Sequence, residues 1–172
     1  MLSERLKKVV AAYPDFPKKG ILFRDVSPVL LDPELLDELV AAIASYPFLL
    51  DTEGIVAIDA RGFIFGSLLA YKLKKPLLIA RKKNKLPGVL IEKEYKLEYG
   101  FDSLSIQKDS LKGMKKFVIV DDLLATGGTA KCVGDLLNSE GKEVLALIVI
   151  INLKFLKGEE NLSFPVYSQL NY

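Results

Sequence analysis

The chain has 172 residues, about the length of one domain, and 50% of them are hydrophobic, so a packed core is expected and disorder is excluded. Its 24 basic and 22 acidic residues give a net charge of +2, which does not favour nucleic acid as a partner. The absence of histidine excludes Ser-His-Asp triads and His-based zinc sites, and leaves oxygen ligands, which favour Mg²⁺. The single cysteine, Cys132, cannot form an intrachain disulfide and is expected in the core.

The longest apolar run covers residues 144–151 and is too short to span a bilayer as a helix. The first residues carry charges and lack the longer apolar stretch of a signal peptide. A lone cysteine also fits a reducing compartment. We therefore expect a cytoplasmic protein that does not contact a membrane.

The predicted elements follow from apolar periodicity and end signals. Asp32 can cap a helix whose first helical position is Pro33, and Gly141 is a stop signal for a later helix. Helices are predicted over residues 3–12, 32–46, 62–75 and 129–140, and strands over residues 54–59, 76–80, 117–121 and 143–150.

Apolar strands that alternate with helices are typical of a parallel sheet covered on both faces. We therefore predict an α/β fold, a single domain over residues 1–172 with an open, mainly parallel sheet flanked by helices. Residues 87–110 do not follow this alternation. Residues 103–107 resemble an exposed antiparallel strand, and the rest is interpreted as a long loop, which in a compact domain is often functional.

The most informative stretch is "FVIVDDLLATGGTA", residues 117–130. An apolar strand leads into Asp121 and Asp122, at the carboxyl end where open α/β sheets bind ligands. Backbone N–H groups of the small-residue loop and the start of the next helix can bind a phosphate. The two carboxylates can accept hydrogen bonds from sugar hydroxyls, so the stretch predicts a ribose 5-phosphate site. The alternative is a tight turn capped by Asp122. The predicted phosphate-binding residues are Ala125, Thr126, Gly127, Gly128 and Thr129.

With this loop, the chain resembles the type I phosphoribosyltransferases, and several segments resemble the adenine-specific members of that family. They are "FPKKGILFRDVSPVL", "DARGFIFG", "RKKNKLPG", "LEYG", "LSIQKD" and the loop itself, and the resemblance as a whole extends over roughly residues 16–158. The resemblance implies a type I phosphoribosyltransferase fold with a small N-terminal hood at residues 1–30, which binds the base, and a flexible catalytic loop at residues 92–102.

The resemblance also implies a reaction. Adenine and 5-phosphoribosyl 1-pyrophosphate would give AMP and pyrophosphate, in a homodimer that uses Mg²⁺. The ion would be bound mainly through the substrate pyrophosphate and water, with no metal ligand from the protein. The chain departs from residues common in the family at Ala60, Asn84 and Asn152.

Basic residues are the candidates for holding pyrophosphate. Arg61 follows the strand at residues 54–59, and its planar fork could stabilise the charge that builds on the leaving group. The alternative is a surface salt bridge between Arg61 and Asp59. The basic run at residues 81–85 is by composition a solvated face, but the resemblance places it at the dimer contact and adds Arg81 and Lys85 to the pyrophosphate site.

The resemblance assigns two further groups of residues. Glu98 would manage the proton of the purine ring, with Tyr99 beside it in a flap that excludes water; the alternative for Glu98 is a solvated carboxylate. Phe23 would stack on the adenine ring while Leu22 and Arg24 contribute main-chain contacts; the alternative for Phe23 is a place in the core.

Two rival functions remain open at this point. One is a phosphoribosyltransferase for another base, such as hypoxanthine, guanine, xanthine or orotate. The other is a transcriptional regulator that senses the activated ribose, which would need an added DNA-binding domain. About twenty residues precede "GILFRD", which is too few for such a domain.

Overall fold

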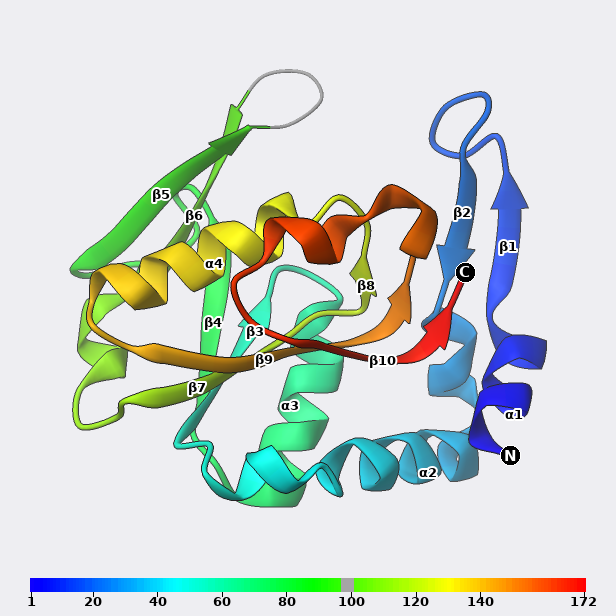
Figure 1. The fold of residues 1–172 in the computed structure, drawn as a ribbon, viewed down its shortest axis with the longest axis horizontal. Helices are drawn as coiled ribbons and strands as arrows, with labels where there is room; N and C mark the ends of the chain where they lie inside the picture. Colours follow the sequence, from blue (N-terminus) through cyan, green and yellow to red (C-terminus); the bar gives the residue numbers. More distant parts are fainter. Residues whose placement is uncertain (97–100) are drawn as a thin grey trace.

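A computed structural model describes residues 1–96 and 101–172 (Figure 1). Within these residues, eight strands form the central sheet, in the order β10-β9-β7-β3-β4-β6-β5, with the short β8 paired to β9. The strands of its parallel part are β3 (Gly54–Ile58), β4 (Leu77–Lys82), β7 (Lys116–Val120), β8 (Leu123–Leu124), β9 (Glu143–Asn152) and β10 (Val166–Asn171).

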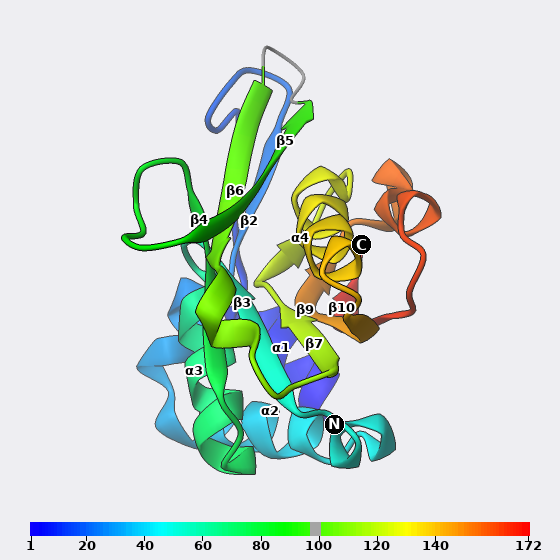
Figure 2. The same cartoon turned by 90° about the vertical axis from the view of Figure 1, so that its left-hand side faces the viewer.

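Helices cover both faces of this sheet, as the alternation of strands and helices predicts (Figure 2). One face packs its buried aliphatic side chains against α1 (Leu2–Val9), α2 (Pro33–Ala44) and α3 (Gly62–Leu73). The other face packs against α4 (Gly128–Ser139). Successive residues of a strand point to opposite faces, so Ile55 belongs to the first core and Val56 to the second. The predicted α/β fold is confirmed.

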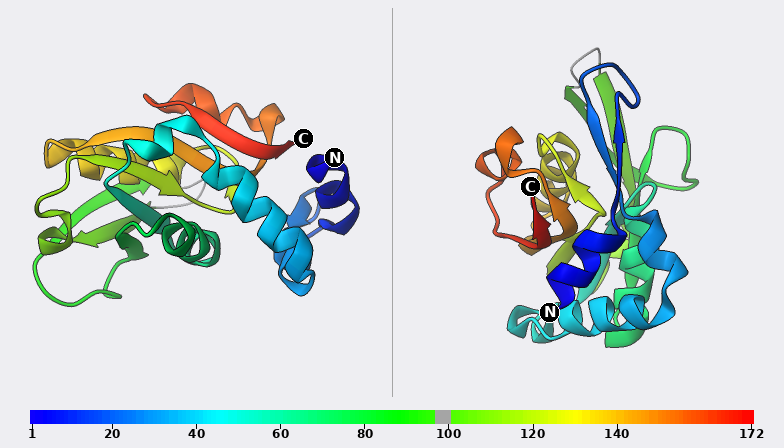
Figure 3. Two further views of the ribbon diagram at one scale, coloured as in Figure 1. Left: turned by 90° about the horizontal axis from the view of Figure 1, so that it is seen from below. Right: turned by 90° about the vertical axis from the view of Figure 1, so that its right-hand side faces the viewer.

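The N-terminal hood begins with a shorter helix than the sequence predicts. α1 ends at Val9, and the hairpin of β1 (Ala11–Pro14) and β2 (Leu22–Asp25) follows. The predicted helix over residues 3–12 is therefore wrong at its end. Pro14 cannot continue a helix, and the backbone of residues 11–14 pairs with β2 instead. Figure 3 shows this hairpin rising beside the main sheet as a separate two-stranded sheet.

The start of α2 is confirmed, because the side chain of Asp32 accepts a hydrogen bond from the N–H of Leu35 at 2.9 Å. Short 3₁₀ helices connect the larger elements. They are η1 (Ser27–Leu31), η2 (Pro47–Leu50), η3 (Lys108–Leu111), η4 (Lys154–Leu156) and η5 (Gly158–Asn161). Within the described part of the chain, no helix is long and apolar enough to cross a membrane.

The segment interpreted as a long loop is largely a β-hairpin. β5 (Leu90–Lys96) pairs antiparallel with β6 (Phe101–Gln107), which continues the sheet beside β4. The antiparallel strand is confirmed, but residues 103–106 are buried, not exposed. Ile91 is also buried while Glu92 and Glu94 are exposed, since α4 covers one side of the hairpin. Glu98 and Tyr99 lie outside the described residues, and the flexibility of residues 92–102 stays a prediction.

Candidate active site

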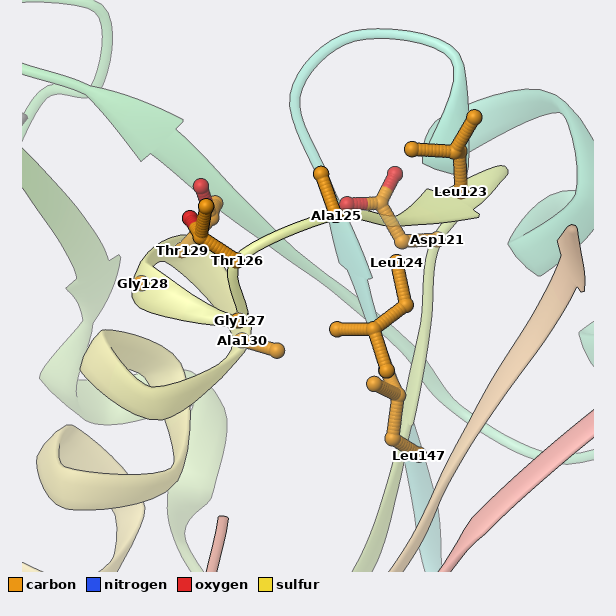
Figure 4. Close-up of a pocket in the computed structure, with 10 residues that line it drawn as sticks. All are labelled: Asp121, Leu123, Leu124, Ala125, Thr126, Gly127, Gly128, Thr129, Ala130 and Leu147. Atoms are coloured by element: carbon orange, nitrogen blue, oxygen red, sulfur yellow. The ribbon is translucent and has the colours of Figure 1, made fainter. Parts of the chain in front are cut away.

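The loop between β8 and α4 surrounds a small cavity of about 90 Å³ (Figure 4). Gly127 caps α4 with a φ of 83°, a left-handed conformation that glycine adopts without steric cost. Because this loop leads into the N-terminus of α4, its backbone N–H groups and the helix dipole can bind an anion. The structure brings together all five predicted phosphate residues, which line the cavity: Ala125, Thr126, Gly127, Gly128 and Thr129.

Two carboxylates lie at the entrance to this loop. Asp121 lines the cavity (Figure 4), and it accepts a 2.8 Å hydrogen bond from the N–H of Asp122. Burial, together with the neighbouring charge of Asp122, raises the pKa of Asp121 well above its ordinary value. A Cβ on Gly62 would lie 2.9 Å from Asp121 Oδ1, so glycine lets this carboxylate lie directly against the start of α3.

Arg61 joins the carboxylates to the hood. Its Nε lies 2.6 Å from Asp122 Oδ2, and its guanidinium carbon lies 5.1 Å from the centre of the Phe23 ring. No described residue makes a well-aligned hydrogen bond to Asp122 Oδ2, so the contact with Arg61 is mainly one of charge. The alternative pairing of Arg61 with Asp59 is wrong. Asp59 instead accepts a 3.1 Å hydrogen bond from Nε of Arg81.

Arg81 lies near the end of β4 and Lys85 in the turn that follows, and β3 lies between β4 and β7, the strand that leads to the phosphate loop. A terminal nitrogen of Arg81 donates to the backbone carbonyl of Lys85 at 3.4 Å, and the Lys85 side chain is exposed. Asn84 has a φ of 61°, which is the left-handed conformation that glycine usually adopts. Asparagine tolerates this conformation better than most other residues. The peptide between Asp59 and Ala60 is cis.

A larger cleft of about 370 Å³ connects the hood with the phosphate loop. It brings together the predicted base-binding residues, Arg61 and most of the phosphate loop. Arg81 and Lys85 do not line it. The lining residues are Ile21, Leu22, Phe23, Arg24, Arg61, Tyr95, Leu123, Ala125, Thr126, Gly128, Thr129, Leu153 and Leu156.

Phe23 is a wall of this cleft. Its ring is half-buried, belongs to neither hydrophobic core, and meets Phe16 edge to face with ring centres 5.2 Å apart. The alternative of a core position for Phe23 is therefore wrong. Beside it, the Arg24 guanidinium carbon lies 4.0 Å from the centre of the Tyr172 ring, so the C-terminal residue holds this side chain by a cation–π contact.

Sequence reasoning missed several residues that line the cleft, notably Tyr95, Leu123, Leu153 and Leu156. Leu123 stands inside the informative loop stretch, and its apolar type gave no chemical signal. Leu153 and Leu156 come directly after β9, and the rule that ligands bind at the carboxyl ends of strands could have indicated them. Tyr95 alternates with charged residues in β5, a pattern that indicates a strand.

An α/β sheet with a glycine-containing loop after a buried strand is found in many protein families, and the comparisons with known proteins identify this one as a phosphoribosyltransferase. Residues 47–169 match the model of the phosphoribosyl transferase domain. The chain is 51% identical over 170 residues to an adenine phosphoribosyltransferase of Prochlorococcus marinus, and the match covers 99% of each chain.

Solved structures lead to the same family. The adenine phosphoribosyltransferase of Thermoanaerobacter pseudethanolicus has a TM-score of 0.91 and 41% identity, with 99% of both chains covered. That of Saccharomyces cerevisiae, complexed with adenine and an imino-altritol bisphosphate, has a TM-score of 0.91 and 34% identity, with 98% of both covered. The chain therefore belongs to the phosphoribosyltransferases and, among them, to the adenine phosphoribosyltransferase family.

Proposed function

We propose that the chain transfers the 5-phosphoribosyl group of 5-phosphoribosyl 1-pyrophosphate to adenine, which gives AMP and pyrophosphate. The observation that carries this proposal is the cleft of about 370 Å³, because it joins an aromatic wall, a cation and a phosphate loop in one space. The yeast relative, crystallised with adenine and a bisphosphate, supports the same pairing of ligands.

The loop at residues 125–129 would hold the 5-phosphate through its backbone N–H groups and the hydroxyls of Thr126 and Thr129. Asp121 and Asp122 would accept hydrogen bonds from the ribose hydroxyls. Asp122 Oδ2 is buried and accepts no well-aligned hydrogen bond, although Arg61 lies beside it, which supports a role in accepting one from a ligand. Phosphate and sugar would thus be fixed by one short stretch of chain, which limits their motion before reaction.

The bond between C1 of ribose and the pyrophosphate oxygen breaks as N9 of adenine attacks, so C1 gains cationic character and the leaving oxygens gain negative charge. We assign the stabilisation of those oxygens to Arg61, with Arg81 and Lys85 from the neighbouring rim. Arg61 already lies beside Asp122, which supports its place next to the sugar. Glu98 would manage the proton on the purine ring, and Tyr99 would close the flap with it.

Mg²⁺ is the cofactor that we propose. Among residues 1–96 and 101–172, no group of three or more His, Cys, Asp or Glu side chains could hold a metal ion. The carboxylates of Asp121 and Asp122 could accept hydrogen bonds from the water ligands of a Mg²⁺ ion that the substrate holds. Bound mainly through the pyrophosphate and water, the ion would neutralise charge on the leaving group.

Adenine would lie between the hood and the carboxyl ends of the strands. Phe23 would cover the face of the ring, while main-chain groups of Leu22 and Arg24 match its edge. The packing of Arg24 on Tyr172 supports a backbone role for Arg24, because its side chain is already engaged. Adenine offers an amino donor at C6 and an acceptor at N1, and hypoxanthine reverses both, so the wrong base would leave polar groups unpaired.

We also propose a homodimer in the cytoplasm. Apolar side chains stand exposed on α3 and at the start of β4, where Ile64, Tyr71 and Leu77 are 39%, 87% and 38% exposed. These two elements also carry Arg61 at the start of α3 and Arg81 near the end of β4, so a partner seated there would lie next to the basic rim.

One assay tests the reaction. The purified chain is mixed with 5-phosphoribosyl 1-pyrophosphate, Mg²⁺ and a single nucleobase, and released pyrophosphate is measured. We expect release with adenine and far less with hypoxanthine, guanine, xanthine or orotate. Comparable efficiency with hypoxanthine would refute the base assignment and leave the transferase class intact.

A further inference from the structure

The segment that follows β9 lies directly behind the phosphate loop. η5 runs beside the start of α4 (Figures 1 and 2). Two glycines meet there, Gly158 of η5 and Gly127 of the loop. A Cβ on Gly158 would overlap the carbonyl oxygen of Ala125 and lie 3.1 Å from the nitrogen of Gly127, and a Cβ on Gly127 would lie 2.5 Å from the carbonyl oxygen of Gly158. The two backbones are therefore in direct contact.

A side chain at position 158 is excluded by steric overlap and not by the backbone conformation. The φ of Gly158 is not positive, so an alanine could adopt the same backbone angles. The obstacle is the backbone of the phosphate loop, which cannot move aside as the end of a flexible side chain could. Any side chain at position 158 must therefore displace residues 125–127.

Asn161 makes the second contact. Its side-chain amide donates a 2.9 Å hydrogen bond to the carbonyl oxygen of Thr126. That carbonyl shares a planar trans peptide with the N–H of Gly127, so fixing one fixes the direction of the other. Asn161 itself is exposed. Its amide is therefore not needed to satisfy the core.

The segment is tied to the sheet. Asn152, buried at the end of β9, donates a 2.6 Å hydrogen bond from its side-chain amide to Glu159 Oε1. The ammonium of Lys154 lies 2.6 Å from the same oxygen. Glu159 stands next to Gly158, so the contacts with the loop are made by a segment that Asn152 ties to the end of β9.

We propose that residues 152–161 form a loop support, in which Gly158 and Asn161 are positioning residues that hold the phosphate loop in its anion-binding conformation. This inference rests on the proposed function, because it takes residues 125–129 as the phosphate site. Backbone donors bind an anion best when no reorganisation is needed, and that requires a rigid second layer behind them. Gly158 and Asn161 set affinity for the sugar phosphate, and neither lines the cleft in which we place the base.

Three variants test the loop support in the full chain. Gly158→Ala places a methyl group against the Ala125 carbonyl. Asn161→Ala removes the donor to Thr126, and Asn161→Gln keeps an amide that can restore it. The matched control is Gly134→Ala: Gly134 lies within α4, and a Cβ there would overlap the ring of Phe164, so packing is disturbed away from the loop.

Calorimetric titration with ribose 5-phosphate, in the absence of adenine, measures the loop directly. We expect Gly158→Ala and Asn161→Ala to bind it about two- to tenfold more weakly, the effect of losing about one hydrogen bond. The KM for 5-phosphoribosyl 1-pyrophosphate should rise in parallel while the KM for adenine stays at the parental value. Asn161→Gln should recover part of the affinity, and Gly134→Ala should bind like the parent.

Parental affinity in Asn161→Ala, or an equal loss in Gly134→Ala, would overturn the loop support. If Gly158→Ala does not fold, the two Asn161 variants decide the matter, because that exposed side chain is dispensable for the core. A chain that releases no pyrophosphate with adenine, yet loses ribose 5-phosphate affinity in these variants, would refute the proposed function and retain the loop support.

Discussion

At the scale of single residues, the burial of Asp121 is unfavourable to the charged form of its carboxyl group. Its pKa is raised by burial and by Asp122. A carboxyl group with a raised pKa binds its proton more readily in the folded chain than in the unfolded one, where the ordinary value is 3.8. The contribution of protonated Asp121 to the free energy of unfolding is fully present below pH 3.8 and is lost as the pH rises through the pKa of the folded chain. At neutral pH, the charge of Asp121 therefore destabilises the free protein.

Asp121→Asn should raise the melting temperature of the free chain at pH 7. A gain of about 1 kcal/mol corresponds to roughly 2–4 °C in a chain of this size. The gain should shrink as pH falls toward the ordinary carboxyl range, and calorimetric titration should show weaker ribose 5-phosphate binding.

Asp135→Asn is the control of opposite sign. Burial alone would raise the pKa of Asp135, but its contacts with Lys93 and Lys131 outweigh burial and lower it. This variant should melt at a lower temperature than the parent. If Asp121→Asn also melted lower, the account of Asp121 would be wrong.

Arg61→Lys keeps the positive charge but loses the planar fork. We expect kcat to fall about a hundredfold, since the cation matters most when the leaving group gains charge. Arg5→Lys is the control, because Arg5 pairs with Asp32 and Glu38 on the surface, and its turnover should match the parent. A parental kcat in Arg61→Lys would remove Arg61 from the leaving-group role.

At the scale of elements, β2 supplies the aromatic wall of the cleft. Phe23→Ala should raise the KM for adenine by roughly 5- to 150-fold, because stacking of a base on an aromatic ring contributes about 1–3 kcal/mol. Affinity for ribose 5-phosphate should be nearly unchanged. Leu31→Ala is a suitable control, since Leu31 is 84% exposed on η1 and does not line the cleft. An unchanged KM for adenine would place the base elsewhere.

The β5–β6 hairpin should respond to ligands. Residues 92–102 are expected to exchange amide hydrogens more slowly when 5-phosphoribosyl 1-pyrophosphate, Mg²⁺ and an unreactive adenine analogue are bound, because closure over the sugar excludes water. Mass spectrometry of peptic fragments measures this, and β3, buried throughout, provides the unresponsive reference. Equal exchange with and without ligands would contradict closure.

Local pattern was enough to predict β3, β4, β7 and β9, because each contains an apolar run, but it did not predict the two-residue β8 or the edge strand β10. It also pointed to residues 125–129, which are consecutive and line one cavity, while their phosphate-binding role stays a prediction. Local pattern failed where pairing with a distant segment determines the secondary structure. Residues 11–14 and 90–96 are strands because their backbones form hydrogen bonds with a neighbouring antiparallel strand. Local pattern also missed Leu153, Leu156 and the pairing of Arg61 with Asp122, since contacts between distant residues leave no local signal.

At the scale of the whole molecule, α3 and β4 present the surface where we expect the second subunit. Tyr71→Glu would put a charge on a side chain that is 87% exposed there. We expect it to weaken the dimer by at least tenfold, because burying an unpaired charge is unfavourable. Sedimentation velocity measures the change. Leu50→Glu is the control, because Leu50 is 83% exposed on η2, and this variant should have the same oligomeric state as the parent. A monomeric parent would refute the dimer outright.

The base wall and the sugar-phosphate loop belong to different sheets, the two-stranded sheet of the hood and the eight-stranded sheet. The hood hairpin pairs with no strand of the eight-stranded sheet, so we expect that its length and sequence can change without altering the register of any strand that carries the sugar site. Evolution can try new acceptors on a fixed donor site in this way. A protein engineer could do the same by recombining β1, β2 and the turn between them, and selecting for nucleotides that the parent does not make.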